Sequence, residues 1–222
     1  MTIIEKPAVL FDLDGVTIDT EPLYTLSEIR LFKEYGVDIP RKDWSLFRGC
    51  SEETFFDLSM ARYGITENRD IFIQKGRKYV MEEFSKNIPF VPGFKDLIAR
   101  LSKNYITGLV TASPVNSLAW IRKKIGLDNY FQHIISGEET EKNKPHPHPY
   151  LEMLSRIDVK PENTIIIEDS IQGLRSAVAS GAHVIALKGS VPSENLEIAH
   201  KIVDHLDEIT MSFLEELLLD PV

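Results

Sequence analysis

The chain of 222 residues contains one cysteine, Cys50, which excludes a disulfide within the chain. It also lacks an excess of positive charge, because 25 lysine and arginine residues stand against 34 aspartate and glutamate residues and the net charge is -9. A nucleic-acid-binding protein usually carries a basic patch, so no nucleic-acid partner is expected. An acidic chain that binds an anion needs local positive charge, which a metal ion or a few lysines would supply.

Long apolar runs are missing as well. No stretch of about 18 or more apolar residues occurs, so neither a membrane-spanning segment nor a membrane partner is expected. Residues 1–7 do not have the charged, apolar and small-residue regions of a signal peptide. Together with the single cysteine, these absences predict a protein of the cytoplasm.

From residue 89 onward, strand and helix patterns alternate along the chain. Short apolar runs predict the strands, and amphipathic segments with capping residues predict the helices between them. The strands are predicted at residues 105–111, 134–136, 164–167, 183–187 and 201–203, and the helices at 91–101, 114–125, 147–157, 171–180 and 208–219. This alternation predicts an α/β fold, a Rossmann-like parallel sheet with helices on both faces.

Residues 17–88 have a different pattern, with no segment that predicts a strand. Helices are predicted at about residues 22–35, 51–63 and 70–86. We therefore expect a catalytic core of residues 1–16 and 89–222, interrupted by an all-helical domain of residues 17–88. An insert that follows the first strand is expected to lie over the strand ends, where it can act as a lid.

The apolar run at residues 8–11 ends in two carboxylates, Asp12 and Asp14, followed by Gly15. Side chains two residues apart on an extended segment point the same way, so the two carboxylates share one side of the strand end. Such an oxygen-only pair suits Mg²⁺, and a carboxylate beside that metal can attack phosphorus. The alternative is an ordinary Asp-Gly turn after a strand.

Three later segments place polar residues after predicted strands. Thr111 ends one predicted strand and Ala112 and Ser113 follow it, at a helix start that can bind a phosphoryl group, although a Ser-Pro helix cap has the same sequence. Lys144 lies beyond the next strand and could neutralise a phosphate or belong to a solvated loop.

Glu168 and Asp169 follow a third run, Ile165-Ile166-Ile167, where buried charge is unfavourable unless it is paired or bound to metal. The carboxyl ends of parallel strands meet at one edge of the sheet. All four segments are therefore expected to converge on one site.

This set of segments resembles the haloacid dehalogenase superfamily, in its phosphatase and phosphomutase branch. The four motifs are Phe11-Asp12-Leu13-Asp14-Gly15-Val16, then Thr111, then Lys144-Pro145, and finally Glu168-Asp169-Ser170 with Gly173. The resemblance covers residues 8–187. It implies an enzyme that acts on a small phosphorylated metabolite, and a monomer is expected for this architecture.

The resemblance also implies a role for each motif residue. Asp12 would be the nucleophile and Asp14 the general acid and base, while Thr111 and Lys144 would bind the phosphoryl group. Mg²⁺ would be the cofactor, bound by Asp12, by the backbone carbonyl of Asp14 and by Asp169. Glu168 would lie in or beside this metal shell.

The helical insert resembles the small cap of the β-phosphoglucomutase-like group. In the segment Arg48-Gly49-Cys50-Ser51, Arg48 could reach a substrate phosphate or hydroxyl, or it could be a surface loop residue. Thr20, at the junction into the cap, is a second candidate substrate-binding residue.

Two positions bear on the choice between phosphatase and mutase. Tyr24 stands where β-phosphoglucomutases have a histidine, and Pro114 stands where they have a lysine. The pair Ser113-Pro114 is similar to sugar-phosphate and hexitol-phosphate phosphatases. We therefore expect a phosphatase acting on a sugar or polyol phosphate, with a phosphomutase as the alternative. A non-catalytic binding protein on the same fold is the alternative from another functional class.

Overall fold

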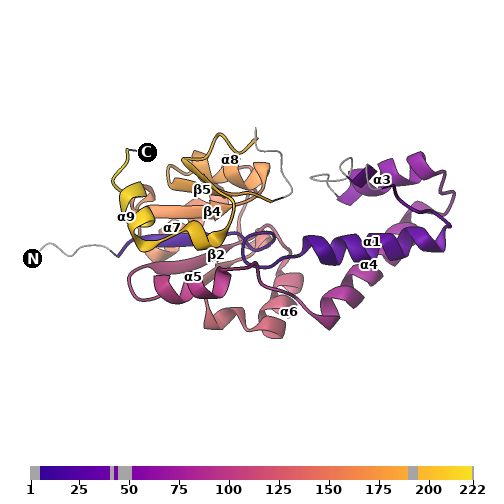
Figure 1. The fold of residues 1–222 in the computed structure, drawn as a ribbon, viewed down its shortest axis with the longest axis horizontal. Coiled ribbons are helices and arrows are strands. Elements are labelled where there is room, and N and C mark those ends of the chain that lie inside the picture. The colour runs from indigo at the N-terminus through magenta and orange to yellow at the C-terminus, as the bar shows by residue number, and fades with distance from the viewer. Residues whose placement is uncertain (1–5, 41–42, 45–51, 190–194, 222) are drawn as a thin grey trace, which may run out of the picture. The chain divides into compact units, whose positions relative to one another are not determined.

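The computed structural model describes residues 6–40, 43–44, 52–189 and 195–221. The chain divides into two compact units. The first consists of Met1–Ile18 together with Phe90–Val222, and the second is the inserted segment Asp19–Pro89. Figure 1 shows the fold with its elements labelled.

The first unit is built on a six-stranded sheet in the order β3-β2-β1-β4-β5-β6, and every neighbouring pair is parallel. The strands are β1 (Ala8–Phe11), β2 (Ile106–Val110), β3 (His133–Ile135), β4 (Thr164–Glu168), β5 (His183–Leu187) and β6 (Lys201–Val203). Because all strands run the same way, the segments that follow β1, β2 and β4 meet at one edge of the sheet.

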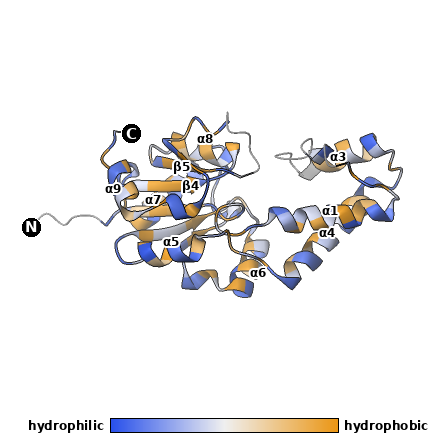
Figure 2. Ribbon diagram, viewed as in Figure 1, coloured by the Kyte–Doolittle hydropathy of each residue, from blue (hydrophilic) through white to orange (hydrophobic). Residues whose placement is uncertain are grey.

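The central strand β1 is buried along its whole length, as expected for a strand covered on both faces. Successive side chains point to opposite faces. Leu10 joins a buried cluster that includes Met153 and Leu174, whereas Phe11 packs edge-to-face against Phe94, with 5.8 Å between the ring centroids. The predominantly apolar sequence of β4 explains its hydrophobic colouring in Figure 2.

Helices cover both faces of this sheet, as the sequence predicts. Residues of α7 (His148–Ile157) and α8 (Ile171–Ala179) belong to the cluster on the Leu10 face, and α5 (Phe94–Leu101) carries Phe94 on the other face. The remaining helices of this unit are α6 (Val115–Ile125) and α9 (Met211–Leu217), with short 3-10 turns that include Gly137–Glu139 and Leu206–Glu208.

The predicted α/β class and all the predicted strands are confirmed, but the last helix is wrong in extent. The sequence predicts a continuous helix over residues 208–219, whereas the structure has a 3-10 turn at Leu206–Glu208 followed by a separate helix, α9. The Thr210 hydroxyl accepts a hydrogen bond from the Phe213 N–H, so it caps a new helix at this point.

The described part of the inserted unit consists of helices and turns and contains no strand. Its labelled helices are α1 (Glu21–Glu34), α3 (Glu52–Tyr63) and α4 (Arg69–Lys86). At its centre the Phe32 ring packs edge-to-face against three other rings, those of Phe55, Tyr63 and Phe72. These contacts give the insert an apolar core of its own.

In the described residues of both units, no helix combines the length and the apolar character needed to span a bilayer.

Candidate active site

Asp12 follows β1 directly and is held in place by its backbone. Its N–H donates to the Ile167 carbonyl of β4 at 3.1 Å, and its own carbonyl accepts a hydrogen bond from the Thr17 hydroxyl at 2.7 Å. The residue is 9 % exposed, so its carboxylate has little contact with water. A rigid backbone therefore presents this buried carboxylate at the sheet edge.

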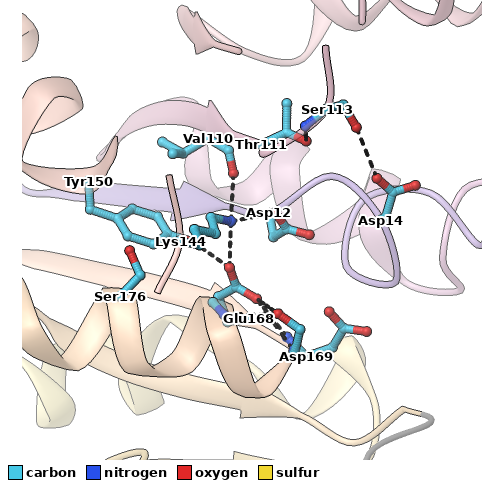
Figure 3. A network of polar contacts seen from close by, with 12 residues as sticks. Asp12, Asp14, Val110, Thr111, Ser113, Lys144, Tyr150, Glu168, Asp169 and Ser176 are labelled. Atoms are coloured by element: carbon cyan, nitrogen blue, oxygen red, sulfur yellow. Dashed lines mark hydrogen bonds and ion pairs between the residues drawn. The ribbon is translucent and has the colours of Figure 1, made fainter. Parts of the chain in front are cut away.

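Lys144 reaches the same point from the loop that precedes α7. Its ammonium donates to Asp12 Oδ1 and to Glu168 Oε1, both at 2.6 Å, and to the Val110 carbonyl at 3.0 Å (Figure 3). An ammonium group has three donors, and these three acceptors match them. The lysine side chain is 6 % exposed, so the predicted solvated-loop alternative does not describe it.

Glu168, the last residue of β4, is fully buried, and both of its carboxylate oxygens accept hydrogen bonds. Oε1 accepts from Lys144 at 2.6 Å and from the Tyr150 hydroxyl at 2.7 Å. Oε2 accepts from the Asp169 N–H and from the N–H and hydroxyl of Ser170, at 3.2 to 3.4 Å. Donors within the protein thus satisfy this buried charge from two sides.

Asp14 and the segment after β2 form the second half of the site. The Ser113 hydroxyl donates to Asp14 Oδ2 at 3.3 Å, and the Ser113 N–H donates to the Thr111 hydroxyl oxygen at 3.0 Å (Figure 3). Thr111 is buried, and among the described residues its hydroxyl proton has no acceptor. That proton is available to an incoming oxygen.

Gly15 allows Asp169 to lie close to the first motif. Its φ of +80° is in the left-handed region, and a Cβ at this position would overlap the Asp169 carboxylate. Glycine is thus required both by the backbone turn and by the approach of the acidic group.

Burial dominates the electrostatics of the carboxylates. It raises the pKa of Asp12 to about 7, even though Lys144 acts in the opposite direction. Burial, followed by the charges of Asp12, Glu168 and Asp14, raises the pKa of Asp169 well above its usual range. Burial also disfavours the Lys144 ammonium, but Asp12 and Glu168 outweigh it and raise the lysine pKa. The site therefore has more negative charge than one lysine offsets.

This donor set fits a hard divalent cation. Oxygen atoms of Asp12, Glu168 and Asp169 all lie within 4.8 Å of one another. Mg²⁺ prefers such carboxylate ligands and usually keeps several waters. Asp12 and Asp169 suit this role better than Glu168, because both Glu168 oxygens already accept hydrogen bonds from the protein.

The structure brings together most of the predicted site residues: Asp12, Lys144, Glu168 and Asp169 on one side, and Asp14, Thr111, Ala112 and Ser113 on the other. Ala112 is exposed between Thr111 and Ser113. Thr20 belongs to the inserted unit, where it is buried at the N-cap of α1 without a side-chain capping bond. Arg48 lies outside the described residues.

Tyr150 is the residue of this site that sequence reasoning missed. It lies in α7, and its ring is part of the buried cluster on the Leu10 face of the sheet. Its one sequence signal is a hydroxyl at an otherwise apolar position of an amphipathic helix, since a buried tyrosine hydroxyl usually needs a partner.

The family is identified by comparison with known proteins. A family model described as haloacid dehalogenase-like hydrolase matches residues 9–187. The chain therefore belongs to the haloacid dehalogenase-like hydrolases, the family that the four motifs resemble. The matched segment contains every site residue described above.

Named relatives include two bacterial phosphatases. The chain is 29 % identical over 175 residues to the phosphorylated carbohydrates phosphatase of Thermotoga maritima, with 78 % of this chain and 81 % of the relative covered. It is 27 % identical over 213 residues to hexitol phosphatase B of Escherichia coli strain K12, with 95 % of this chain and 93 % of the relative covered.

A solved structure with a similar fold is the β-phosphoglucomutase of Clostridium difficile. It superposes with a TM-score of 0.72 at 24 % identity, and 96 % of each chain is covered. At this level of identity the likeness concerns the fold and leaves the reaction open.

Proposed function

We propose that this protein is a Mg²⁺-dependent phosphatase that hydrolyses a small sugar or polyol phosphate through an aspartyl-phosphate intermediate. The observation that carries the proposal is the contact of Lys144 with both Asp12 and Glu168 at 2.6 Å, beside the Thr111–Ser113 segment. A buried carboxylate next to a fixed ammonium and a donor hydroxyl is the arrangement that phosphoryl transfer needs. The carbohydrate-phosphate and hexitol phosphatases among the relatives support the substrate class.

In the proposed reaction, a carboxylate oxygen of Asp12 bonds to phosphorus while the bond from phosphorus to the alcohol oxygen breaks. Asp14 gives a proton to the leaving alcohol, then takes one from the water that attacks the aspartyl-phosphate. Phosphate leaves and Asp12 is regenerated. Asp14 suits proton exchange because it is half-exposed and hydrogen-bonded to Ser113.

The remaining residues bind and neutralise. Lys144 would contact both Asp12 and a phosphoryl oxygen, and the Thr111 hydroxyl would donate to another phosphoryl oxygen. Asp12, Asp169 and the Asp14 carbonyl would hold Mg²⁺, which supplies positive charge that favours the ionised form of Asp12. We further propose that the inserted unit Asp19–Pro89 is the cap, and that Thr20 and Arg48 recognise the substrate.

We prefer hydrolysis to phosphoryl isomerisation because of the residues at two positions. Residue 24 is a tyrosine and therefore has no imidazole for proton transfer. Its ring is 42 % exposed and packs edge-to-face against Phe84. Pro114 is the N-cap of α6 and has no ammonium with which to bind a second phosphate. Both features support a phosphatase.

The test is release of inorganic phosphate from a panel of sugar phosphates, polyol phosphates and nucleotides, with Mg²⁺ present. Asp12→Asn removes the nucleophile and keeps its size, so we expect turnover to fall by at least about 10³-fold. Asp96→Asn, an exposed change on α5, is the matched control and should retain full activity.

Release confined to a few small sugar or polyol phosphates would support the proposal. Undiminished release by Asp12→Asn would overturn the assignment of the nucleophile. If the folded protein releases no phosphate from any compound, conversion of β-glucose 1-phosphate would identify a mutase. Inactivity there as well would favour a binding protein on this fold.

A further inference from the structure

Tyr150 places a polar atom inside the apolar layer between α7 and the sheet. The residue is fully buried in the cluster that contains Leu10, Met153 and Ile166. Its hydroxyl donates to Glu168 Oε1 at 2.7 Å (Figure 3). A buried hydroxyl is unfavourable unless it is hydrogen-bonded, so this contact fixes both side chains.

Glu168 is therefore held from two directions. The donors on Oε2 come from the start of α8, namely the Asp169 N–H and the N–H and hydroxyl of Ser170. The donors on Oε1 are Lys144 and Tyr150. Of the two donors on Oε1 in the described part of the chain, Lys144 is charged and Tyr150 is neutral.

Lys144 has a flexible side chain with four methylene groups, so its ammonium needs external restraint to stay on one acceptor. Glu168 and Asp12 both attract it at 2.6 Å and compete for its position. The Tyr150 hydroxyl satisfies part of Oε1, which reduces the attraction of Glu168 for the lysine. The Tyr150 ring also lies 5.0 Å from the ammonium and limits its movement on that side.

We propose that Tyr150 is a positioning residue that acts through Glu168 to keep the Lys144 ammonium directed at Asp12. This inference rests on the proposed function, because it assigns the distance between Lys144 and Asp12 a role in phosphoryl transfer. Without the hydroxyl, Lys144 is the donor that remains on Glu168 Oε1 among the described residues. The ammonium then shifts toward Glu168 and away from the nucleophile.

The first test is Tyr150→Phe, which removes one oxygen and keeps the ring. We expect kcat to fall about tenfold, with KM changed by less than about twofold, because an outer partner of a site residue is lost. The matched control is Tyr105→Phe. Tyr105 is also buried in the first unit, and among the described residues its hydroxyl has no hydrogen bond to a site residue. Unchanged kcat in Tyr150→Phe would overturn the inference.

The second test asks whether Tyr150 acts through Glu168. In a Glu168→Gln background the charge that attracts Lys144 is absent, so adding Tyr150→Phe should change kcat by less than about twofold. The same loss in both backgrounds would contradict the inference, because it would mean that Tyr150 acts by another route.

The third test does not depend on activity. Acetic anhydride labels accessible lysine amines, and mass spectrometry measures the rate at each position. We expect Lys144 in Tyr150→Phe to react at least about threefold faster than in wild type or in Tyr105→Phe, because its restraint is weaker. Faster labelling in a protein that releases no phosphate would preserve the positioning role and reject the proposed function. Unchanged labelling in an active protein would reject the positioning role alone.

Discussion

Gly173 contributes to the site because it lacks a side chain. It lies in the first turn of α8, and a Cβ at this position would overlap the carboxylate of Glu168. The Ser170 hydroxyl caps the same turn by accepting from the Gly173 N–H at 3.0 Å. The helix start and the buried carboxylate are therefore packed directly against each other.

Gly173→Ala is expected to displace Glu168 and, with it, Lys144. Overpacking of this kind destabilises a protein by about 1–3 kcal/mol, and we expect kcat to fall as well. Urea unfolding and phosphate release measure the two effects. Gln172→Ala, an exposed change on the same turn, should alter neither, and normal kinetics in Gly173→Ala would show that the carboxylate can move freely.

Residues at strand ends could be predicted from the sequence, whereas a contact between distant side chains could not. Asp12 and Lys144 follow apolar runs, and a parallel sheet brings such positions to one edge. Tyr150 looks like any other buried position of an amphipathic helix. Its partner, Glu168, lies on the next strand, 18 positions later in the sequence. Local periodicity does not predict a contact between side chains so far apart in the chain.

At the scale of elements, strands and most helix ends followed from local signals. Gly126, with a φ of +68°, ends α6 where glycine predicts a helix end. The predicted extent of the last helix is wrong because the apolar spacing continues through Thr210, whereas the threonine hydroxyl caps a new helix at that point. The order of the strands was not predictable either, since it depends on long-range pairing that local patterns do not encode.

Strand β5 carries a buried titratable group, His183, which is 1 % exposed. Burial, and then the nearby His200, lower its pKa below the usual value, while the Glu162 carbonyl and Asp220 act in the opposite direction. Among the described residues its Nδ1 has no hydrogen-bond partner. Burial in the folded protein therefore favours the neutral form of this histidine.

The pH dependence of stability follows from this lowered pKa. The unfolded chain takes up the His183 proton near pH 6.5, whereas the folded chain does so at a lower pH. The free energy of unfolding should thus fall as the pH drops below about 6.5. His183→Gln should reduce this slope in urea titrations between pH 5 and pH 7, and exposed His133→Gln should not. Equal slopes in wild type and His183→Gln would contradict the assignment.

At the scale of the whole molecule, the described part of the core unit concentrates negative charge at the sheet edge. Asp12 and Glu168 contact the Lys144 ammonium, and the charges of Asp12, Asp14 and Glu168 all act on Asp169. A ligand that binds the folded state and not the unfolded state raises the melting temperature. A cation that binds this acidic cluster in the folded state is therefore expected to stabilise the core unit.

We therefore expect MgCl₂ to raise the melting temperature by a few degrees, because saturating ligand adds about 2–3 kcal/mol of stability. NaCl at equal ionic strength should not do so. Asp169→Asn should remove the response to MgCl₂, and its persistence in that variant would place the bound ion elsewhere. Removal of Mg²⁺ with a chelator should also abolish phosphate release.

The position of β1 in the sheet has a consequence for folding during synthesis. The strand precedes both of its neighbours along the chain, since Ala8 pairs with Ile106 on one side and with Thr164 on the other. The inserted unit and the core residues up to β4 must therefore be synthesised before β1 can pair on both sides. Until β4 is made, one side of β1 has no neighbouring strand, while the helical insert can form its own local contacts. A chain that stops before residue 164 leaves the middle of its sheet open, which makes early termination a route to aggregation rather than to a smaller working enzyme.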